Sequence, residues 1–351
     1  MSCGPGGAHT SATAVLSDLG EAELLRRLLG DVPDTPLAQV GPGDDAAVLR
    51  VPDGRVVVTT DTLVQDVDFR TDWSSATDIG IKAAVQNLAD IAAMGARPTG
   101  FVLTLVAPGS TGADWAVQLG RAVIDRCAES GAAVIGGDLS SGSRIMVSLT
   151  VFGDLDGQPP VLRSGARPGD VLAVAGRTGW SAAGLDLLAD EAFAARAGGD
   201  PDTAGAARAA LAAHRRPDPP LVAAAAARAA GVHAMIDVSD GLVRDAGRIA
   251  TAGAGQIRLD PGLAGLSEPV RLLTPLAAHR EGQPASARRI ASEWVLTGGE
   301  DHALLAAFSA DADIPPQFRA VGTVVSGQDE LVMLTGGQLT PAGPGFDHFG
   351  G

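Results

Sequence analysis

The spacing of hydrophobic residues follows a helical period in some stretches of the chain and an extended period in others. Between residues 75 and 94, apolar side chains recur every three or four positions, which predicts an amphipathic helix that ends at Gly95. Ser75 and Asp78, three residues later, form a variant of the capping box that begins helices. The same spacing predicts further helices over residues 21–29, 114–130, 179–188, most of 191–230, and 242–252.

Short runs rich in β-branched and other apolar residues predict strands between these helices. These runs cover residues 101–107, 132–138, 145–153, 171–175 and 294–297, and residues 234–239 are expected to be extended. Residues 46–49 and 55–60 are predicted to form an antiparallel hairpin around the turn at 52–54. This hairpin would carry carboxylates at both of its ends.

Acidic residues recur where these predicted strands begin or end. Asp45 follows two glycines, Asp61 follows two threonines, and a glycine pair precedes both Asp138 and Glu300. Ligands often collect at strand ends, and hard cations such as Mg²⁺ select oxygen ligands. We therefore predict that the stretch from Asp45 to Asp61 anchors a Mg²⁺–polyphosphate site, which the later acidic motifs complete.

Two further motifs extend this candidate site. On the predicted helix 75–94, Asn87 and Asp90 lie three residues apart and share one face, toward which Lys82 could also point. The alternative is that these polar side chains form a solvent-exposed face of the helix and no site. Asp237 and Asp240 flank the start of the helix predicted over 242–252, and a helix cap explains one of these two carboxylates but not both.

The 351 residues suggest two domains, and a hydrophobic content of 46% is enough for sizeable cores. A Pro/Gly-rich joint at residues 163–170 places the boundary. We expect a flexible leader at 1–20, an N-terminal domain at 21–160 and a C-terminal α/β domain at 161–351.

The net charge of −15 argues against general binding to a nucleic-acid backbone. The two cysteines lack metal-ligand spacing, and we found neither a signal peptide nor an apolar run of membrane-spanning length. A cytoplasmic protein without membrane contact is therefore expected. Lys82 is the single lysine among 26 basic residues, so either an ammonium group is needed there or a surface lysine was left over.

Common phosphate-binding and hydrolytic signatures are missing from the sequence. No P-loop can be built around Lys82, and the protein-kinase set, the serine-hydrolase elbow and HExxH do not occur. Residues 41–46 match G-x-G-x-x-A, but a predicted strand follows where a dinucleotide site needs a helix. Many carboxylates mixed with hydroxyls suit phosphoryl transfer, which needs mainly positioning and charge neutralisation.

Taken in order, the motifs resemble the thiamine-monophosphate kinase family of the aminoimidazole-ribonucleotide-synthetase-like superfamily. The resemblance runs from about residue 20 to the C-terminus, and the ordered set is far more specific than any single motif. The motifs are Gly-Pro-Gly-Asp-Asp45, Thr-Thr-Asp61, Asn-Leu-Ala-Asp-Ile-Ala-Ala-Met-Gly95, Gly-Gly-Asp138, Arg-Ser-Gly-Ala-Arg-Pro-Gly-Asp170, Ile-Asp-Val-Ser-Asp-Gly241, Gly-Gly-Glu-Asp301 and Gly-Phe-Asp-His-Phe349.

The resemblance implies a two-domain α/β (α+β) fold in which strands of the N-terminal domain pair across a homodimer. It also implies ATP-dependent phosphorylation of thiamine monophosphate to thiamine diphosphate with several Mg²⁺ ions. Carried over by position, the metal ligands are Asp45, Thr59, Thr60, Asp61, Asp90, Asp138, Asp237 and Asp240, with Asp61, Asp90 and Asp138 central to catalysis. Gly137, Asp138, Arg163 and Ser239 would contact ATP, and Asp68, Glu300 and Phe346 would hold the substrate.

The chain departs from the family pattern at two of these positions. Asp68 stands where the family often has a histidine, which puts the contact to the substrate phosphate in doubt, and Arg70 nearby is a substitute. Phe346 stands where a tyrosine is frequent, so a stacking face remains without a hydroxyl.

Two other functions compete with the kinase. One is another ATP-using enzyme of the superfamily, making aminoimidazole ribonucleotide or selenophosphate; Cys3 is the only candidate for selenide chemistry. The other is a non-catalytic protein that binds divalent metals. Carboxylates placed at strand ends beside glycine pairs favour an enzyme, because a solvated acidic face needs no such placement.

Overall fold

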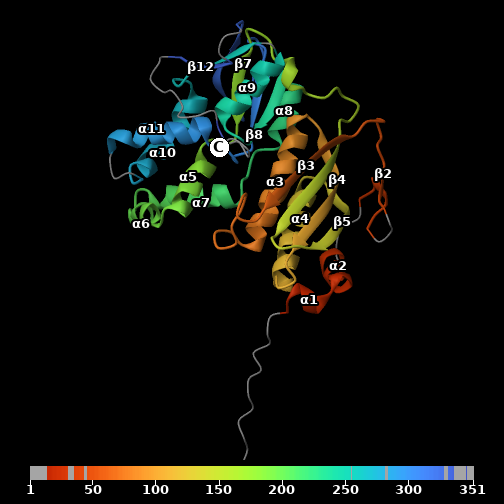
Figure 1. Cartoon of the computed structure of the whole chain (residues 1–351). Helices are drawn as coiled ribbons and strands as arrows, with labels where there is room; N and C mark the ends of the chain where they lie inside the picture. The colour runs from red at the N-terminus through yellow and green to blue at the C-terminus, as the bar shows by residue number, and fades with distance from the viewer. Residues whose placement is uncertain are drawn as a thin grey trace, which may run out of the picture.

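The computed structural model describes residues 14–30, 35–42, 46–253, 255–280, 284–327, 331–335 and 345. Besides a two-stranded sheet of β1 and β2, two larger sheets lie in separate halves of a mixed α/β fold, and α3 reaches from one to the other (Figure 1). The elements of the first half are α1 (Leu16–Leu19), α2 (Glu21–Leu29), β1 (Ala38–Val40), β2 (Val48–Leu49), β3 (Val57–Val64), α3 (Ala76–Ala93), β4 (Arg97–Ala107), α4 (Ala113–Glu129), β5 (Ala133–Ser141) and β6 (Met146–Asp154).

The first sheet has the strand order β3-β6-β4-β5. All its pairs are antiparallel except β4 and β5, which are parallel because α4 carries the chain back across the sheet. Alternate residues such as Phe101 and Leu149 face α3 and α4 and are fully buried. The opposite face of the sheet exposes Val58, Thr62 and Met146.

The second sheet has the order β12-β9-β11-β7-β10-β8, and only its β12–β9 pair is parallel. Its two faces bury different helices, since residues alternate in direction along each strand. The elements of this half are the 3₁₀ turn η1 (Arg163–Gly165), β7 (Val171–Ala175), α5 (Trp180–Ala189), α6 (Glu191–Gly199), α7 (Ala204–Arg215), α8 (Ala223–Ala229), β8 (Ala234–Val238), α9 (Leu242–Gly253), β9 (Gln256–Leu259), α10 (Ala264–Ala277), α11 (Pro284–Thr297), β10 (Ala303–Phe308), β11 (Phe318–Val325) and β12 (Val332–Leu334).

Helix α3 belongs to the cores of both halves. Leu88 and Ile91 pack on the first sheet, whereas Ala92 and Ala93 pack with α8 on the second. The predicted capping box is confirmed, because the Ser75 side chain accepts from the Asp78 amide and Asp78 accepts from the Ser75 amide. The predicted domain boundary stays a prediction, and it falls between β6 and β7.

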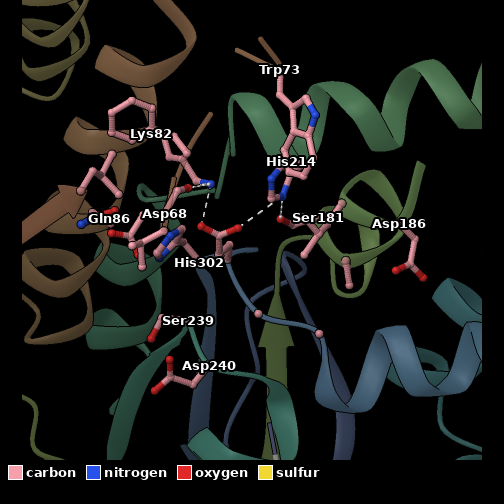
Figure 2. A pocket seen from close by; sticks show the side chains of 18 of the residues that line it. Asp68, Trp73, Lys82, Gln86, Ser181, Asp186, His214, Ser239, Asp240 and His302 are labelled. Atoms are coloured by element: carbon pink, nitrogen blue, oxygen red, sulfur yellow. Dashed lines mark hydrogen bonds and ion pairs between the residues drawn. The ribbon is translucent and has the colours of Figure 1, made fainter. Parts of the chain in front are cut away.

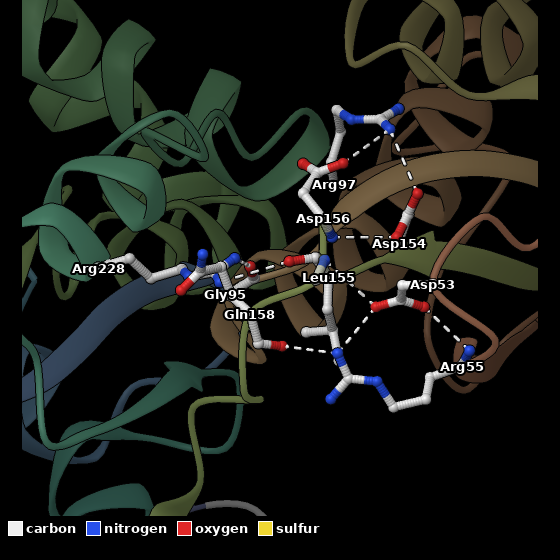
Figure 3. Close-up of polar contacts among 10 residues, drawn as sticks. Asp53, Arg55, Gly95, Arg97, Asp154, Leu155, Asp156, Gln158 and Arg228 are labelled. Carbon is white, nitrogen blue, oxygen red and sulfur yellow. Dashed lines mark hydrogen bonds and ion pairs between the residues drawn. The ribbon is translucent and has the colours of Figure 1, made fainter.

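Polar contacts also fasten the two halves together (Figure 3). The Arg228 guanidinium of α8 donates to the carbonyls of Gly95, just past α3, and Leu155, just past β6. In the segment that follows β6, the Gln158 carbonyl accepts from Arg55 at 3.1 Å, and Arg55 also pairs with Asp53. These bonds hold the end of α3 and the segment after β6 at fixed positions.

Two local predictions are wrong. The expected hairpin does not form, because β2 pairs with β1, and β3 instead pairs with β6 along its whole length. Residues 294–297 belong to α11 rather than to a strand. The buried side chains of this helix have helical spacing, as at Ile290, Ala291, Trp294 and Val295. The short apolar run at residues 294–297 is too brief to distinguish a helix from a strand. Among the described residues, no helix is long and apolar enough to cross a membrane.

Gly184 sets how closely α5 approaches α7, and both helices carry residues of the site described below. A methyl group at Gly184 would lie 2.1 Å from the Ala210 carbonyl oxygen, which is backbone and cannot turn away. We expect Gly184→Ala to lower the free energy of unfolding by about 1–3 kcal/mol through overpacking, measured by denaturant titration. Gly198→Ala is the matched control, since no atom lies within 4 Å of its added methyl. Equal stability of the two variants would contradict this packing.

Candidate active site

A cavity of about 1000 Å³ lies between the two halves (Figure 2). Its walls come from β3 and α3 on one side and from α5, α7, α11 and the loop after α11 on the other. The lining residues include Asp61, Lys82, Ser239, Arg280 and Glu300. The cavity therefore connects acidic motifs that are far apart in the sequence.

An acidic cluster forms where β3, α3 and β8 meet. The Thr59 hydroxyl donates to Asp90 Oδ2 at 2.6 Å, which joins the edge strand to α3. Burial and the nearby charge of Asp237 raise the pKa of Asp90 to about 7, and burial likewise raises the pKa of Asp61. Burial opposes a charge on His302, but its 3.2 Å contact with Asp237 outweighs this and raises the pKa of His302.

This cluster has the composition of a Mg²⁺ site. Asp61 Oδ2 is one of the few buried side-chain oxygens in the described part of the chain without a hydrogen-bond partner. Carboxylates that raise one another's pKa are a donor set that a divalent cation would stabilise. Within the described ranges, no group of three or more His, Cys, Asp or Glu side chains is already arranged around one metal position. The residue types and the unpaired oxygen thus fit Mg²⁺. A complete coordination shell would require small side-chain movements or further ligands.

The loop after β8 is held by a residue that the sequence analysis did not single out. The carboxylate of Asp245, on α9, accepts from the amides of Ser239 at 3.1 Å and Asp240 at 3.0 Å. Arg248 pairs with both Asp240 and Asp245, at 2.6 Å for the latter. The Asp240 carboxylate is therefore engaged by a guanidinium here, while its backbone is fixed at the cavity.

Glu300 is clamped by contacts from both halves of the molecule. Its backbone is left-handed, with φ of 64°, and its amide donates to the Ser239 carbonyl at 2.7 Å. Oε1 lies 2.6 Å from Lys82 Nζ and Oε2 lies 3.3 Å from His214 Nδ1, as the dashed lines in Figure 2 mark. Burial opposes ionisation of Glu300, but the Lys82 ammonium and the neighbouring His214 and His302 together outweigh burial and lower the pKa of Glu300. Burial, then the Lys82 charge, lowers the pKa of His214 to about 4.

The structure does not bring every predicted residue to this cavity. Thr60 points to the opposite face of the sheet and donates to the Leu149 carbonyl at 2.9 Å. Asp138 lies on β5, the other edge of the sheet, where it accepts from Ser140 at 2.9 Å. Three strand spacings separate β3 from β5, which is about 14 Å. A single chain therefore does not place Asp138 beside Asp61.

The remaining predicted residues have varied surroundings. The Asp68 carboxylate turns back to accept from the Val64 amide at 2.8 Å, and its backbone lines the cavity. Gly137 lies on β5 next to Asp138, and Arg163 is exposed in η1. Asp45 and Phe346 lie outside the described residues, so their predicted roles stay predictions.

Trp73, Ser181 and His214 are among the lining residues that the sequence analysis did not single out. Trp73 lines the cavity, and the Arg70 guanidinium lies 4.5 Å from the centre of its ring. His214 ends α7, and its Nδ1 is 3.1 Å from the hydroxyl of Ser181 on α5. Neither position has a local signal, because α7 is an alanine-rich helix without a motif. The sequence left open whether Lys82 acts directly; in the structure its ammonium pairs with Glu300.

Comparison with known proteins decides the family. Residues 43–155 match the family described as AIR synthase related protein, N-terminal domain. The thiamine-monophosphate kinase of Mycobacterium tuberculosis is 42% identical over 347 residues, covering 97% of this chain and 96% of that protein. This chain belongs to the thiamine-monophosphate kinase family.

Solved structures of the thiamine-monophosphate kinase family share the fold. The crystal structure of the enzyme from Stenotrophomonas maltophilia K279a has a TM-score of 0.71 and 30% identity, covering 90% of this chain and 95% of that one. The structure of AaThiL complexed with AMPPCP and TMP has a TM-score of 0.70 and 27% identity, covering 97% of this chain and all of that one (100%). The predicted superfamily and the α/β fold class are thus confirmed.

Replacing Lys82 by methionine tests the electrostatics of this thiamine-monophosphate kinase site. The variant removes the charge that, after burial, lowers the pKa of His214, while the Glu300 carboxylate that raises it remains. We expect the pKa of His214 to rise from about 4 in the K82M variant, followed by NMR of the ring C–H signals against pH. His279, paired with Asp200 at 3.1 Å, is the internal control. An unchanged His214 titration would contradict the contact between these groups.

Proposed function

We propose that this chain catalyses the ATP-dependent phosphorylation of thiamine monophosphate to thiamine diphosphate. The observation that carries the proposal is 42% identity to a thiamine-monophosphate kinase along 97% of the chain, with an acidic cluster opening into a cavity of about 1000 Å³. The relative solved with AMPPCP, an ATP analogue, and TMP supports the pairing of nucleotide and acceptor in this fold. The enzyme is thus a phosphotransferase whose acceptor is a phosphate group.

The residues that would hold Mg²⁺ are those of the acidic cluster. Thr59, Asp61 and Asp90 offer oxygens from β3 and α3, and Asp237 offers them from β8. When bound, Mg²⁺ would neutralise phosphate oxygens and align donor and acceptor. Asp240 would join after release from Arg248, and Asp45 remains a predicted ligand.

The acceptor needs no strong base, because a phosphate monoester is already largely ionised near pH 7. His302 fits this view, since its contact with Asp237 raises its pKa and so favours the protonated ring. Its part is to orient the Asp237 carboxylate. The chain's contribution to the reaction is therefore to position the reactants and to exclude water between its two halves.

We also propose a homodimer in which the partner subunit completes the site. Asp138 and Asp61 lie at opposite edges and on opposite faces of one sheet, so one subunit cannot bring them together. The exposed sheet face carries Val58, 52% exposed, and Met146, 37% exposed, which a second copy would cover. Asp138 of the partner subunit would then reach the phosphates held near Asp61.

Removing the unpaired carboxylate tests the reaction. We expect Asp61→Asn to lower kcat for thiamine diphosphate formation at least 100-fold, because the isosteric amide cannot neutralise a cation. The product is quantified by chromatography from ATP, Mg²⁺ and thiamine monophosphate, and Asp202→Asn, at an exposed turn, is the control. Near-native turnover by the Asp61 variant would remove it from the metal set. Turnover with formylglycinamidine ribonucleotide or selenide instead would favour a sister enzyme, and metal binding without turnover would favour a non-catalytic protein.

Mixed dimers test whether the site is shared between subunits. Asp61→Asn and Asp138→Asn chains are each expected to be nearly inactive alone. Co-expressed, about half of the dimers would be mixed, and each would hold one site with both native carboxylates, restoring about a quarter of the wild-type rate. Two acids that served the same subunit's site would give no restoration, and that result would overturn the shared arrangement.

A further inference from the structure

The only lysine of the chain is buried at the centre of the cavity wall. Lys82 is 3% exposed, on the face of α3 that looks toward the C-terminal half. Its ammonium lies 2.6 Å from Glu300 Oε1 and donates to the Asp68 carbonyl at 3.2 Å. All other positive side chains of the chain, histidines aside, are arginines, so this position is distinguished by its ammonium.

A compact ammonium suits this position better than a guanidinium. Lys82 stands between the Glu300 carboxylate and a backbone carbonyl, and single donors in different directions satisfy both. A planar guanidinium would require a wider, flat slot to make the same bonds. The lysine therefore fixes one oxygen of Glu300 from the N-terminal half of the molecule.

The second oxygen of Glu300 faces the other half of the molecule. His214 Nδ1 lies 3.3 Å from Oε2 and 3.1 Å from the Ser181 hydroxyl oxygen. The left-handed backbone at Glu300 and the hydrogen bond that its N–H donates to the Ser239 carbonyl fix the backbone from which the side chain projects. A carboxylate has about four lone-pair sites, so beside Lys82 it still offers acceptor sites to the cavity, where its side chain is 34% exposed.

The charges of Lys82 and Glu300 already balance each other. Lys82 is positive, Glu300 is negative, and His214 is neutral near pH 7, because its pKa lies near 4. A balanced carboxylate attracts a distant cation weakly but still accepts a hydrogen bond from an N–H group placed against it. The surroundings of Glu300 thus have a balanced charge, unlike the acidic cluster around Asp61.

We infer that Lys82 is a positioning residue that presents Glu300 as a hydrogen-bond acceptor for the amino group on the pyrimidine ring of the substrate. The inference rests on the proposed acceptor, thiamine monophosphate. Its thiazolium ring carries a positive charge but no N–H, whereas its pyrimidine carries an exocyclic amino group. Lys82 would thereby make the enzyme choose an amino-substituted ring over one that bears a carbonyl group there.

Three acceptors separate hydrogen bonding from charge attraction. Thiamine monophosphate is compared with oxythiamine monophosphate, in which a carbonyl replaces the amino group, and with a deaza analogue whose sulfur ring is neutral. For the wild-type enzyme we expect kcat/KM to fall at least 100-fold with the oxo compound, because an unpaired buried polar group is costly. The deaza analogue is expected to stay within about threefold of thiamine monophosphate, since the thiazolium charge is not what Glu300 recognises.

Variants then identify the part played by Lys82. Lys82→Met should raise KM for thiamine monophosphate and reduce the amino-to-oxo preference to about 10-fold or less, with KM for ATP within about twofold of wild type. Glu300→Gln, whose amide can donate to a carbonyl, should shift the preference toward the oxo compound. Arg280→Met is the matched control, because it removes a paired cation from the same cavity without touching Glu300, and its preference should equal that of the wild type.

The outcomes distinguish this inference from the proposed function. Wild-type phosphorylation of thiamine monophosphate with an unchanged amino-to-oxo preference in the Lys82 variant would overturn the role of Lys82 alone. A large loss with the deaza analogue would show that Glu300 is a counter-ion for the thiazolium, which also overturns it. Circular dichroism and the melting temperature of each variant are measured in parallel. Should Lys82→Met not fold, the Glu300→Gln preference decides, and an unchanged preference there rejects the inference.

Discussion

The packing of α3 against both sheets is the contact on which the site depends. The helix is buried along most of its length, so its polar residues cannot reach bulk water and must find partners inside the protein. Lys82 finds Glu300, Asp90 finds Thr59, and Asp78 closes the helix start with Ser75. Glu300 and Thr59 lie on other elements, whereas Ser75 caps α3 itself, so the position of α3 fixes both the acidic cluster and the contacts of Glu300.

The cavity divides two tasks between two electrostatic environments. Around Asp61, Asp90 and Asp237, carboxylates crowd together and oppose one another's ionisation, which a divalent cation would relieve. Around Glu300, by contrast, the ammonium of Lys82 already compensates the negative charge. The acidic cluster would therefore suit a cation, whereas the compensated Glu300 carboxylate would suit a hydrogen-bond donor. The two environments are tied through the Glu300 amide, which bonds to Ser239, two residues from Asp237.

Local patterns in the sequence were sufficient to predict elements whose contacts are close in sequence or whose periodic pattern extends over many residues. The capping box at Ser75 and the apolar stripe behind it predict α3 within one residue at each end. Strand pairing is not local, so the sequence did not reveal that β3 pairs with β6, nor that Asp138 lies across the sheet from Asp61. His214 was missed for a similar reason, since its partners come from α3, α5 and the loop after α11.

The ordered motifs carried the family prediction, because their sequence of occurrence is specific even where each motif alone is a common turn. They could not show whether acids from one subunit or two meet, which depends on the order of strands in the sheet. They also could not show that Asp240 is engaged by Arg248, because a cap at the start of α9 and a metal ligand have the same local pattern.

The burial of the one lysine also shapes how the protein can be handled chemically. Amine-directed reagents such as succinimidyl esters act on exposed, unprotonated amines, and Lys82 is 3% exposed and bound to a carboxylate. The described part of the folded chain therefore offers such reagents no exposed lysine. Amine-directed labelling would thus leave the cavity between the two halves unmodified.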